Sequence, residues 1–152
     1  MTVRAYVAVG ANLGDARATV LRAMTDLGFL SEARVVACSS LYRSAPVDAT
    51  GPDFINAVVE LETGLAPEAL LQELQRLELG AGRERPYRNA PRTLDLDLLY
   101  YGDVVMETDA LTLPHPRIHE RAFVLLPLAE IAPGRVSDAT LKRVADQCIE
   151  RL

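Results

Sequence analysis

The first 28 residues carry two different hydrophobic patterns, one typical of a strand and one of a helix. Every second residue from Val3 to Val9 is apolar, as in a β-strand with one buried face, and this alternation stops at Gly10. A helix is expected after the turn over 10–14, because Asp15 can cap its amino end and Gly28 can end it. One face of that helix is apolar, with Val20, Ala23, Met24 and Leu27 at helical spacing.

The middle of the chain is expected to contain two more strands and a second helix. Runs rich in β-branched and apolar residues over 35–42 and 54–61 predict two strands, and a loop over 44–53 separates them. Pro67 suits the first turn of a second helix, which should end near Gly80. Its apolar stripe contains Leu70, Leu71, Leu74 and Leu77.

A loop over 82–91 and a strand over 93–101 complete a β-α-β-β-α-β order. This order predicts an α/β (α+β) fold of the ferredoxin-like type, an antiparallel sheet with both helices on one face and the other face available. A hairpin over 102–112 and a final helix from Asp138 to the end should follow. The helix is expected because apolar residues recur at helical spacing: Leu141, Val144, Ala145, Cys148, Ile149 and Leu152.

Composition narrows the class of protein. With 152 residues, of which 49% are hydrophobic, the chain should form one domain over 1–152 with a sizeable core. Its net charge of −5 disfavours nucleic acid and anionic membranes as partners. Cys38 and Cys148 are too few for a disulfide framework and are expected to be small buried residues. No apolar run is long enough for a membrane span, and we expect a cytoplasmic protein.

Two carboxylates stand on one side of the strand predicted over 93–101. Side chains alternate along a strand, so Asp95 and Asp97 share the face opposite Leu94, Leu96 and Leu98. At about 6 Å and an effective dielectric of about 20, their repulsion is on the order of 3 kcal/mol, which a cation would offset. Oxygen ligands at this spacing suit Mg²⁺, which leaves its other positions to water and phosphates. The alternative is a solvent-facing edge strand with ordinary acidic residues.

The loop before this strand concentrates positive charge within an acidic chain. It contains one acidic residue, Glu84, and the four arginines Arg83, Arg85, Arg88 and Arg92. Because guanidinium groups pair well with phosphate oxygens, a basic loop leading into two carboxylates indicates a polyphosphate site. A solvated basic loop is the alternative, and neither a P-loop nor a complete GxGxxG motif is present.

Other polar and aromatic residues fall where a site could use them. Glu78 falls on the apolar stripe of the second helix, so either that end frays into solvent or the carboxylate faces a site. Asn56 should lie on the same open face as the acidic pair, where its amide could read the edge of a heterocycle. Phe54 and Phe123 could stack on such a ring, although either could belong to the core. His115 suits a surface or phosphate contact better than a zinc site.

Taken together, these residues resemble the 6-hydroxymethyl-7,8-dihydropterin pyrophosphokinases of folate biosynthesis. The main signature is the segment 88–99, RNAPRTLDLDLL. The supporting segments, in matching order and spacing, are 9–14, 39–43, 54–58, 113–116 and 121–123.

The resemblance implies an enzyme that transfers the β,γ-pyrophosphoryl group of ATP to the hydroxymethyl oxygen of the pterin and releases AMP. It implies catalytic roles for Arg83, Arg92, Asp95 and Asp97, the two aspartates holding two Mg²⁺ ions. The ATP-binding residues that it implies are Gln75, Glu78, Arg85, Arg88, Leu98, Thr112, His115 and Arg121. Those implied for the pterin are Ser44, Ala45, Val47, Phe54, Asn56 and Phe123. A monomer is expected.

Four positions depart from this family's pattern and bear on loop closure and nucleotide clamping: Pro86, Asn89, Ala110 and Pro116. Two other functions stay open at this point. Paired carboxylates on a strand also serve palm-like two-metal nucleases and nucleotidyl transferases, although the acidic chain argues against a polynucleotide substrate. A non-catalytic ferredoxin-like binding module is the third hypothesis.

Overall fold

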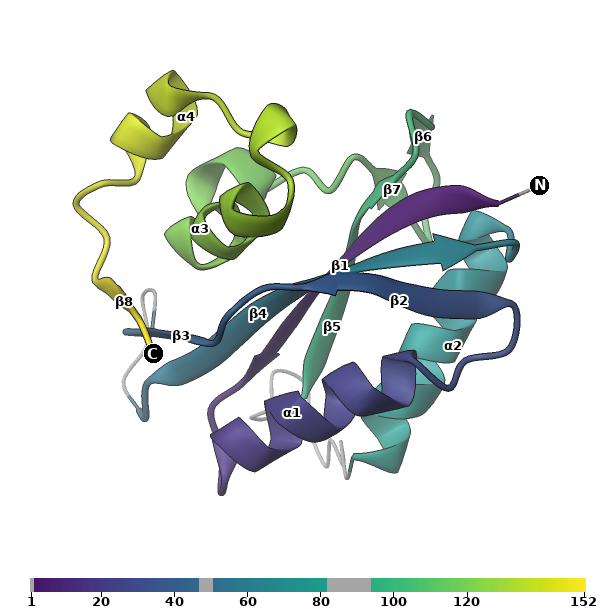
Figure 1. Cartoon of the computed structure of the whole chain (residues 1–152), viewed down its shortest axis with the longest axis horizontal. Coiled ribbons are helices and arrows are strands. Elements are labelled where there is room, and N and C mark those ends of the chain that lie inside the picture. Colours follow the sequence, from purple (N-terminus) through teal and green to yellow (C-terminus); the bar gives the residue numbers. More distant parts are fainter. Residues whose placement is uncertain (1, 47–50, 82–93) are drawn as a thin grey trace.

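The computed structural model describes residues 2–46, 51–81 and 94–152 (Figure 1). The first half of the chain contributes β1 (Val3–Ala11), α1 (Ala16–Leu27), β2 (Ala33–Cys38), β3 (Tyr42–Ser44), β4 (Phe54–Thr63) and α2 (Pro67–Gly80). The second half contributes β5 (Asp95–Tyr101), β6 (Met106–Glu107), β7 (Thr112–Leu113), η1 (Ile118–Glu120), α3 (Ala122–Ile131), η2 (Pro133–Arg135), α4 (Asp138–Arg143) and β8 (Ile149–Arg151). No helix among these residues is long and apolar enough to cross a membrane.

The main sheet confirms the predicted ferredoxin-like arrangement. Its strands follow the order β5-β1-β4-β3-β8, with β2 also paired to β4, and all of these pairs are antiparallel. α1 and α2 cover one face, where their leucines and valines pack on inward-facing residues of β1, β4 and β5 (Figure 1). The predicted ends of these helices are also confirmed, because the Asp15 carboxylate accepts from the Ala18 N–H at 3.1 Å and Pro67 begins α2.

The sequence predicts that the second face of the sheet is available, but part of this face is covered. α3 packs across it and forms a second core around Tyr6, Val58 and Leu99. This helix is apolar on nearly all sides, so it is buried between the sheet and the C-terminal segments. Because α3 covers only part of this face, the remaining part can form a cavity between the helix and the open strands.

The run over 35–42 forms two strands instead of one. The hydroxyl of Ser39 accepts from the backbone N–H of Val58 at 2.9 Å, which replaces a backbone partner and interrupts the ladder between β2 and β4. The chain resumes pairing with β4 only at Tyr42, in β3. This break carries Ser44 to the far end of β4, next to Phe54.

The predicted final helix is wrong beyond Arg143. α4 spans only Asp138–Arg143 and is capped by Ser137, whose hydroxyl accepts from Thr140 N–H at 3.1 Å, and not by Asp138. The chain then turns and forms β8, which pairs with the open edge of β3. In residues 149–151, hydrogen bonding to the backbone of β3 therefore prevails over the helical spacing of the apolar residues. Both cysteines are exposed, which contradicts the expectation that they are buried: Cys38 ends β2 and Cys148 precedes β8.

Candidate active site

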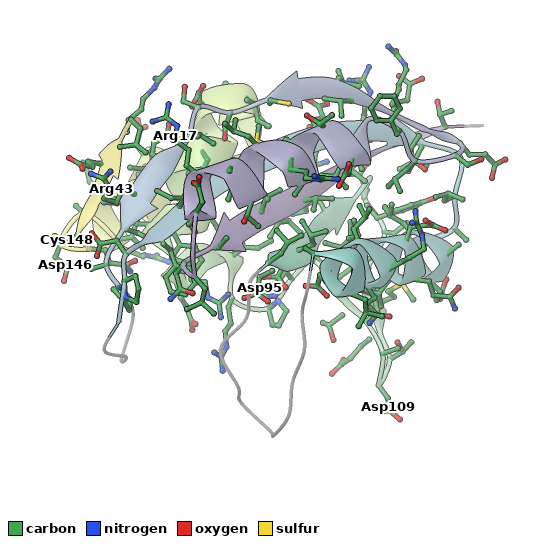
Figure 2. The ribbon with its side chains drawn as sticks, turned by 90° about the horizontal axis from the view of Figure 1, so that it is seen from below. Arg17, Arg43, Asp95, Asp109, Asp146 and Cys148 are labelled. Atoms are coloured by element: carbon green, nitrogen blue, oxygen red, sulfur yellow. The ribbon has the colours of Figure 1, made fainter. Side chains whose placement is uncertain are left out.

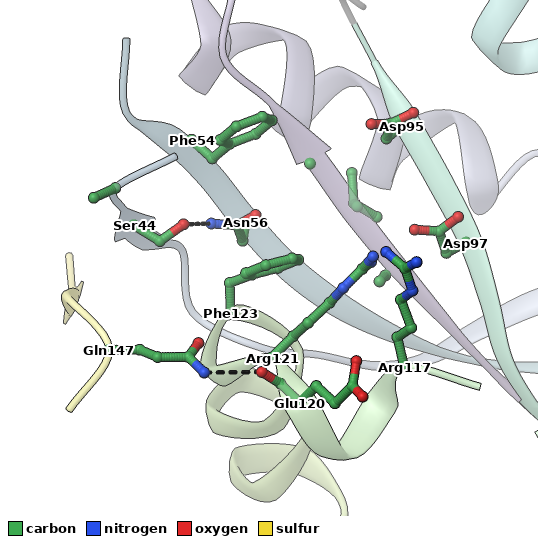
Figure 3. A pocket seen from close by; sticks show the side chains of 14 residues that line it. Ser44, Phe54, Asn56, Asp95, Asp97, Arg117, Glu120, Arg121, Phe123 and Gln147 are labelled. Atoms are coloured by element: carbon green, nitrogen blue, oxygen red, sulfur yellow. Dashed lines mark hydrogen bonds between the residues drawn. The ribbon is translucent and has the colours of Figure 1, made fainter. Parts of the chain in front are cut away.

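A cavity of about 510 Å³ lies on the second face of the sheet, between β1, β4 and β5, the η1–α3 junction and the segment before β8 (Figure 3). Its lining includes residues from six parts of the chain that are distant in sequence. They are Ala8, Val9, Gly10, Ser44, Ala45, Phe54, Asn56, Asp95, Asp97, Arg117, Glu120, Arg121, Phe123 and Gln147.

The strand register sets the floor of this cavity. Gly10 on β1 lies opposite Asn56 on β4 and opposite Asp95 on β5, so the three residues form one row across the sheet. With neighbouring strands about 4.8 Å apart, the Asn56 and Asp95 backbones are about 10 Å apart. A side chain at Gly10 would fill the space between them, since its Cβ would lie only 3.3 Å from Oδ1 of Asn56. The next row, with Ala8 opposite Asp97, also has a small residue at its centre.

One end of the cavity combines an amide with two aromatic rings. Asn56 is only 4% exposed, and its Nδ2 donates to the hydroxyl of Ser44 at 2.8 Å. This bond holds the amide in one orientation and leaves Oδ1 and a second N–H for a ligand. Figure 3 shows Phe54 and Phe123 on opposite sides of the amide. A flat polar heterocycle could stack on these rings while the amide reads its edge.

The other end of the cavity holds the two carboxylates and two arginine side chains. Asp95 and Asp97 lie on the same face of β5, as predicted, and both are partly exposed to the cavity. The side chains of Arg117 and Arg121 point toward the side of the cavity where Asp97 lies (Figure 3). Burial lowers the pKa of His115, the positive charges of Arg121 and Arg117 lower it further, and the negative charge of Asp97 opposes them.

The acidic pair fits a magnesium ion. The two carboxylates offer only oxygen atoms, and the described residues contain no group of three or more His, Cys, Asp or Glu side chains that could enclose a metal. Mg²⁺ usually takes one or two carboxylates and completes its coordination with water and substrate phosphates. The cavity beside Asp95 and Asp97 has room for such ligands.

Glu78 supports β5 from outside the cavity. Its carboxylate accepts from the backbone N–H of Leu96 at 2.9 Å, on the residue between Asp95 and Asp97. Because Glu78 is only 5% exposed, the interpretation that the end of this helix frays into solvent is wrong. β5 is the edge strand of the sheet, and this bond holds it on the side that has no neighbouring strand of the main sheet.

Eight of the sequence-predicted site residues line the cavity: Ser44, Ala45, Phe54, Asn56, Asp95, Asp97, Arg121 and Phe123. Five described residues do not, and their nucleotide contacts stay predictions: Gln75, Glu78, Leu98, Thr112 and His115. Leu98 in particular is 3% exposed and packs in the core beneath α1 and α2. The remaining predicted residues, Val47, Arg83, Arg85, Arg88 and Arg92, lie outside the described residues.

Sequence reasoning missed three polar residues of the lining, Arg117, Glu120 and Gln147. Arg117 could have been found from its charge and its position four residues before Arg121. Gln147 could not, since the segment that contains it was predicted to be helical. Small residues on the cavity face of β1, Ala8 and Gly10, were also overlooked, although their alternation with Val7 and Val9 placed them there.

Known proteins share both the sequence and the fold. The family described as 7,8-dihydro-6-hydroxymethylpterin-pyrophosphokinase (HPPK) matches residues 6–133. A protein of Pseudomonas aeruginosa named 2-amino-4-hydroxy-6-hydroxymethyldihydropteridine pyrophosphokinase is 46% identical, over 100% of this chain and 98% of that protein. A Haemophilus influenzae protein of the same name is 44% identical, over 88% of this chain and 84% of that protein.

Among solved structures, Plasmodium falciparum HPPK-DHPS superposes with a TM-score of 0.68 at 14% identity. The match covers 94% of this chain but 41% of that longer one, so this likeness concerns the fold alone. The sequence matches extend over most of the chain, and they include the strand with the two carboxylates and the junction that holds Arg121 and Phe123. The chain therefore belongs to the 7,8-dihydro-6-hydroxymethylpterin-pyrophosphokinase family.

Proposed function

We propose that this protein transfers the pyrophosphoryl group of ATP to the hydroxymethyl group of 6-hydroxymethyl-7,8-dihydropterin, a step of folate synthesis. Relatives that carry the name of this activity are 41–46% identical over most of the chain. The observation that carries the proposal is the row of Asn56, Gly10 and Asp95 across three strands. This row supports the proposal because it puts the Asn56 amide, which could read a heterocycle, and the Asp95 carboxylate, which could hold a metal-bound phosphate, toward opposite ends of one cavity.

In the proposed complex the pterin lies between Phe54 and Phe123, with its edge against Asn56. The Ser44 hydroxyl contributes indirectly, because its 2.8 Å bond to the Asn56 amide keeps that amide turned toward the ligand. Ala45 lines the same end of the cavity. These groups bind and orient the pterin so that its hydroxymethyl group points toward the acidic end.

The triphosphate of ATP lies at the end with Asp95, Asp97 and Arg121. Asp95 and Asp97 would hold the magnesium, for which the resemblance implies two ions. Bound Mg²⁺ neutralises phosphate charge and stabilises the negative charge that develops on the leaving oxygen. Arg121 and Arg117 add positive charge at this end, and guanidinium groups match phosphate oxygens in geometry.

In the reaction, the hydroxymethyl oxygen forms a bond to the β-phosphorus, and the bond from that phosphorus to the oxygen shared with the α-phosphate breaks. AMP leaves with this oxygen, and the hydroxyl proton is released. Phosphoryl transfer of this kind needs little covalent help from the protein. The main contribution of the described residues is to align the two substrates in a single cavity, which replaces a costly encounter in solution.

Several finer features rest on the sequence and the family resemblance. They include a single pyrophosphokinase domain, a monomer, a cytoplasmic location and the phosphate contacts of the arginines in residues 82–93. A two-metal nuclease or nucleotidyl transferase is not favoured, because the curated relatives are pyrophosphokinases.

The proposal is tested by measuring AMP formed from ATP. AMP should appear only when Mg²⁺ and the hydroxymethyl pterin are both present, with one pterin pyrophosphate formed for each AMP. AMP release that ignores the pterin, or cleavage of DNA or RNA, would contradict the proposal. Binding of the pterin and nucleotide without any AMP would support the non-catalytic module instead.

A further inference from the structure

The C-terminal segment forms one wall of the cavity at its aromatic end. β8 pairs with β3, with Ile149 opposite Ser44, and the backbone N–H of Ala45 donates to the carbonyl of Cys148 at 3.2 Å. Figure 2 shows Arg43, Asp146 and Cys148 at the same end of the molecule, away from Asp95. The matched family region ends at residue 133, so this wall lies beyond it.

Gln147 connects this wall to the junction between η1 and α3. Its Nε2 donates to the carbonyl of Glu120 at 2.8 Å (Figure 3). Its Oε1 accepts from the backbone N–H of Ala122 at 2.9 Å. A carbonyl needs a donor and an N–H needs an acceptor, so only one orientation of the amide satisfies both partners. Both polar atoms of the side chain are therefore engaged with the backbone on either side of Arg121.

The bond to Ala122 replaces a missing helix cap. Arg121 is the N-cap residue of α3, and its side chain makes no capping hydrogen bond. The first N–H groups of a helix have no partner within the helix, and one that is buried needs an acceptor from elsewhere. Ala122 is 1% exposed, and Gln147 supplies that acceptor from 25 residues further along the chain.

Two residues that line the cavity, Arg121 and Phe123, lie in or next to this stretch of backbone. The guanidinium carbon of Arg121 lies 5.4 Å from the centroid of the Phe123 ring, so the two side chains are held against each other. The directions of the Arg121 and Phe123 side chains depend on the backbone at residues 120–122. Gln147 is hydrogen-bonded to this backbone at Glu120 and at Ala122. Misplacement of binding groups by about 1 Å can reduce the rate of an enzyme by about 100-fold.

We propose that Gln147 is a positioning residue for the transfer reaction, which holds Phe123 against the pterin and Arg121 toward the phosphates. This inference rests on the proposed function. It predicts that Gln147 sets the affinity for the pterin, although its own polar atoms are engaged by the backbone. Nucleotide binding should depend on it less, because Gln147 acts at the phosphate end through the backbone beside Arg121, whereas Asp95 and Asp97 are carried by β5.

The test compares Gln147→Ala, Gln147→Glu and Gln72→Ala. Gln147→Glu keeps an acceptor for Ala122 but loses the donor to Glu120, whereas Gln72 is exposed on α2 and serves as the matched control. Calorimetry measures the pterin Kd in the presence of Mg²⁺ and a non-hydrolysable ATP analogue, and the analogue Kd without pterin. Steady-state assays add kcat and KM.

For Gln147→Ala we expect the pterin Kd and KM to rise about 10-fold, or about 1.4 kcal/mol. The analogue Kd should change less than about threefold, because Asp95 and Asp97 on β5 are untouched and Arg121 keeps its charge at this end of the cavity. Gln147→Glu should weaken pterin binding by about threefold, and Gln72→Ala should match the wild type. A melting temperature measured in parallel separates loss of stability from loss of positioning.

A pterin Kd within twofold of the wild type in the folded Gln147 variants overturns the inference, whatever their melting temperatures. If Gln147→Ala does not fold, Gln147→Glu alone decides, and wild-type affinity in that variant overturns the inference. Failure of the wild-type protein to bind the pterin overturns the proposed function instead, so the two failures are distinguishable.

Discussion

Gly10 provides the sharpest test of the proposed cavity. Its missing side chain leaves the floor open between Asn56 and Asp95, and an alanine Cβ would lie 3.3 Å from Oδ1 of Asn56 and 3.9 Å from the carbonyl of Ile55. The Gly10 backbone does not need the left-handed region, since it is not among the glycines with positive φ. Gly10→Ala therefore changes the cavity without straining the backbone.

The effect of Gly10→Ala on stability is limited because two contributions oppose each other. The Asn56 amide is buried and bonded to Ser44, so it must shift by a few tenths of an ångström, and such overpacking costs about 1–3 kcal/mol. Replacing a glycine stabilises the fold by about 0.4–1 kcal/mol through the unfolded chain. The net loss is about 0–2.6 kcal/mol, which lowers the melting temperature by up to roughly 10 °C.

The effect of Gly10→Ala on pterin binding is larger. A displaced Asn56 loses or weakens two hydrogen bonds to the pterin, each contributing about 0.5–1.5 kcal/mol, which corresponds to a rise in KM of about 5- to 150-fold. The KM for ATP should change by less than threefold.

Steady-state assays of AMP formation measure both constants, and Gly80→Ala is the matched control because no atom lies within 4 Å of its added Cβ. A pterin KM within twofold of the wild type in Gly10→Ala would refute the placement of the pterin over this row.

Three further predictions concern single side chains of the site and its support. Asp97→Asn should keep the circular dichroism spectrum but lower kcat/KM at least about 1,000-fold, or about 4 kcal/mol, and wild-type turnover would exclude its role with the metal. Glu78→Ala removes the acceptor of Leu96 N–H and should lower the free energy of unfolding in urea by about 1–3 kcal/mol, whereas unchanged stability would contradict this support of β5. Burial and the hydrogen bond to Glu130 raise the pKa of Tyr42 to about 12, so the neutral phenol stabilises the fold fully below pH 10 and loses this effect between pH 10 and about 12. The difference in unfolding free energy between wild type and Tyr42→Phe should be about 1.5–3 kcal/mol at pH 8 and should shrink at pH 11.5, and a constant difference would argue against this titration.

Several features of the site could be predicted from local sequence because they depend on strand alternation alone. Asp95 and Asp97 had to share a face once Leu94, Leu96 and Leu98 faced the core, since the side-chain period of a strand is two.

The face of β4 on which Asn56 lies followed from the same alternation. The opposition of Asn56 to Gly10 did not, because register between strands depends on pairing across the sheet.

Features that depend on distant partners could not be predicted. The last residues have helical spacing, yet Ile149–Arg151 forms a strand because β3 offers an open edge that exists only in the folded chain. Val35–Tyr42 looked like one strand, and it is divided by the bond between Ser39 and Val58.

The amino-acid sequence by itself determined the β-α-β-β-α-β order up to Tyr101, apart from the division of one strand at Ser39, the face of each strand that carries the acidic and amide groups, and the family. These depend on short-range periodicity and on motifs that are continuous in the chain. Only the tertiary structure decided that Gln147 braces the Arg121 backbone, that Glu78 supports β5, and that Phe54 and Phe123 lie on opposite sides of Asn56. Phe54 is a near neighbour of Asn56 in the chain, but each of the other contacts joins segments at least 18 residues apart. These contacts therefore depend on how the sheet, the helices and the C-terminal segment pack together.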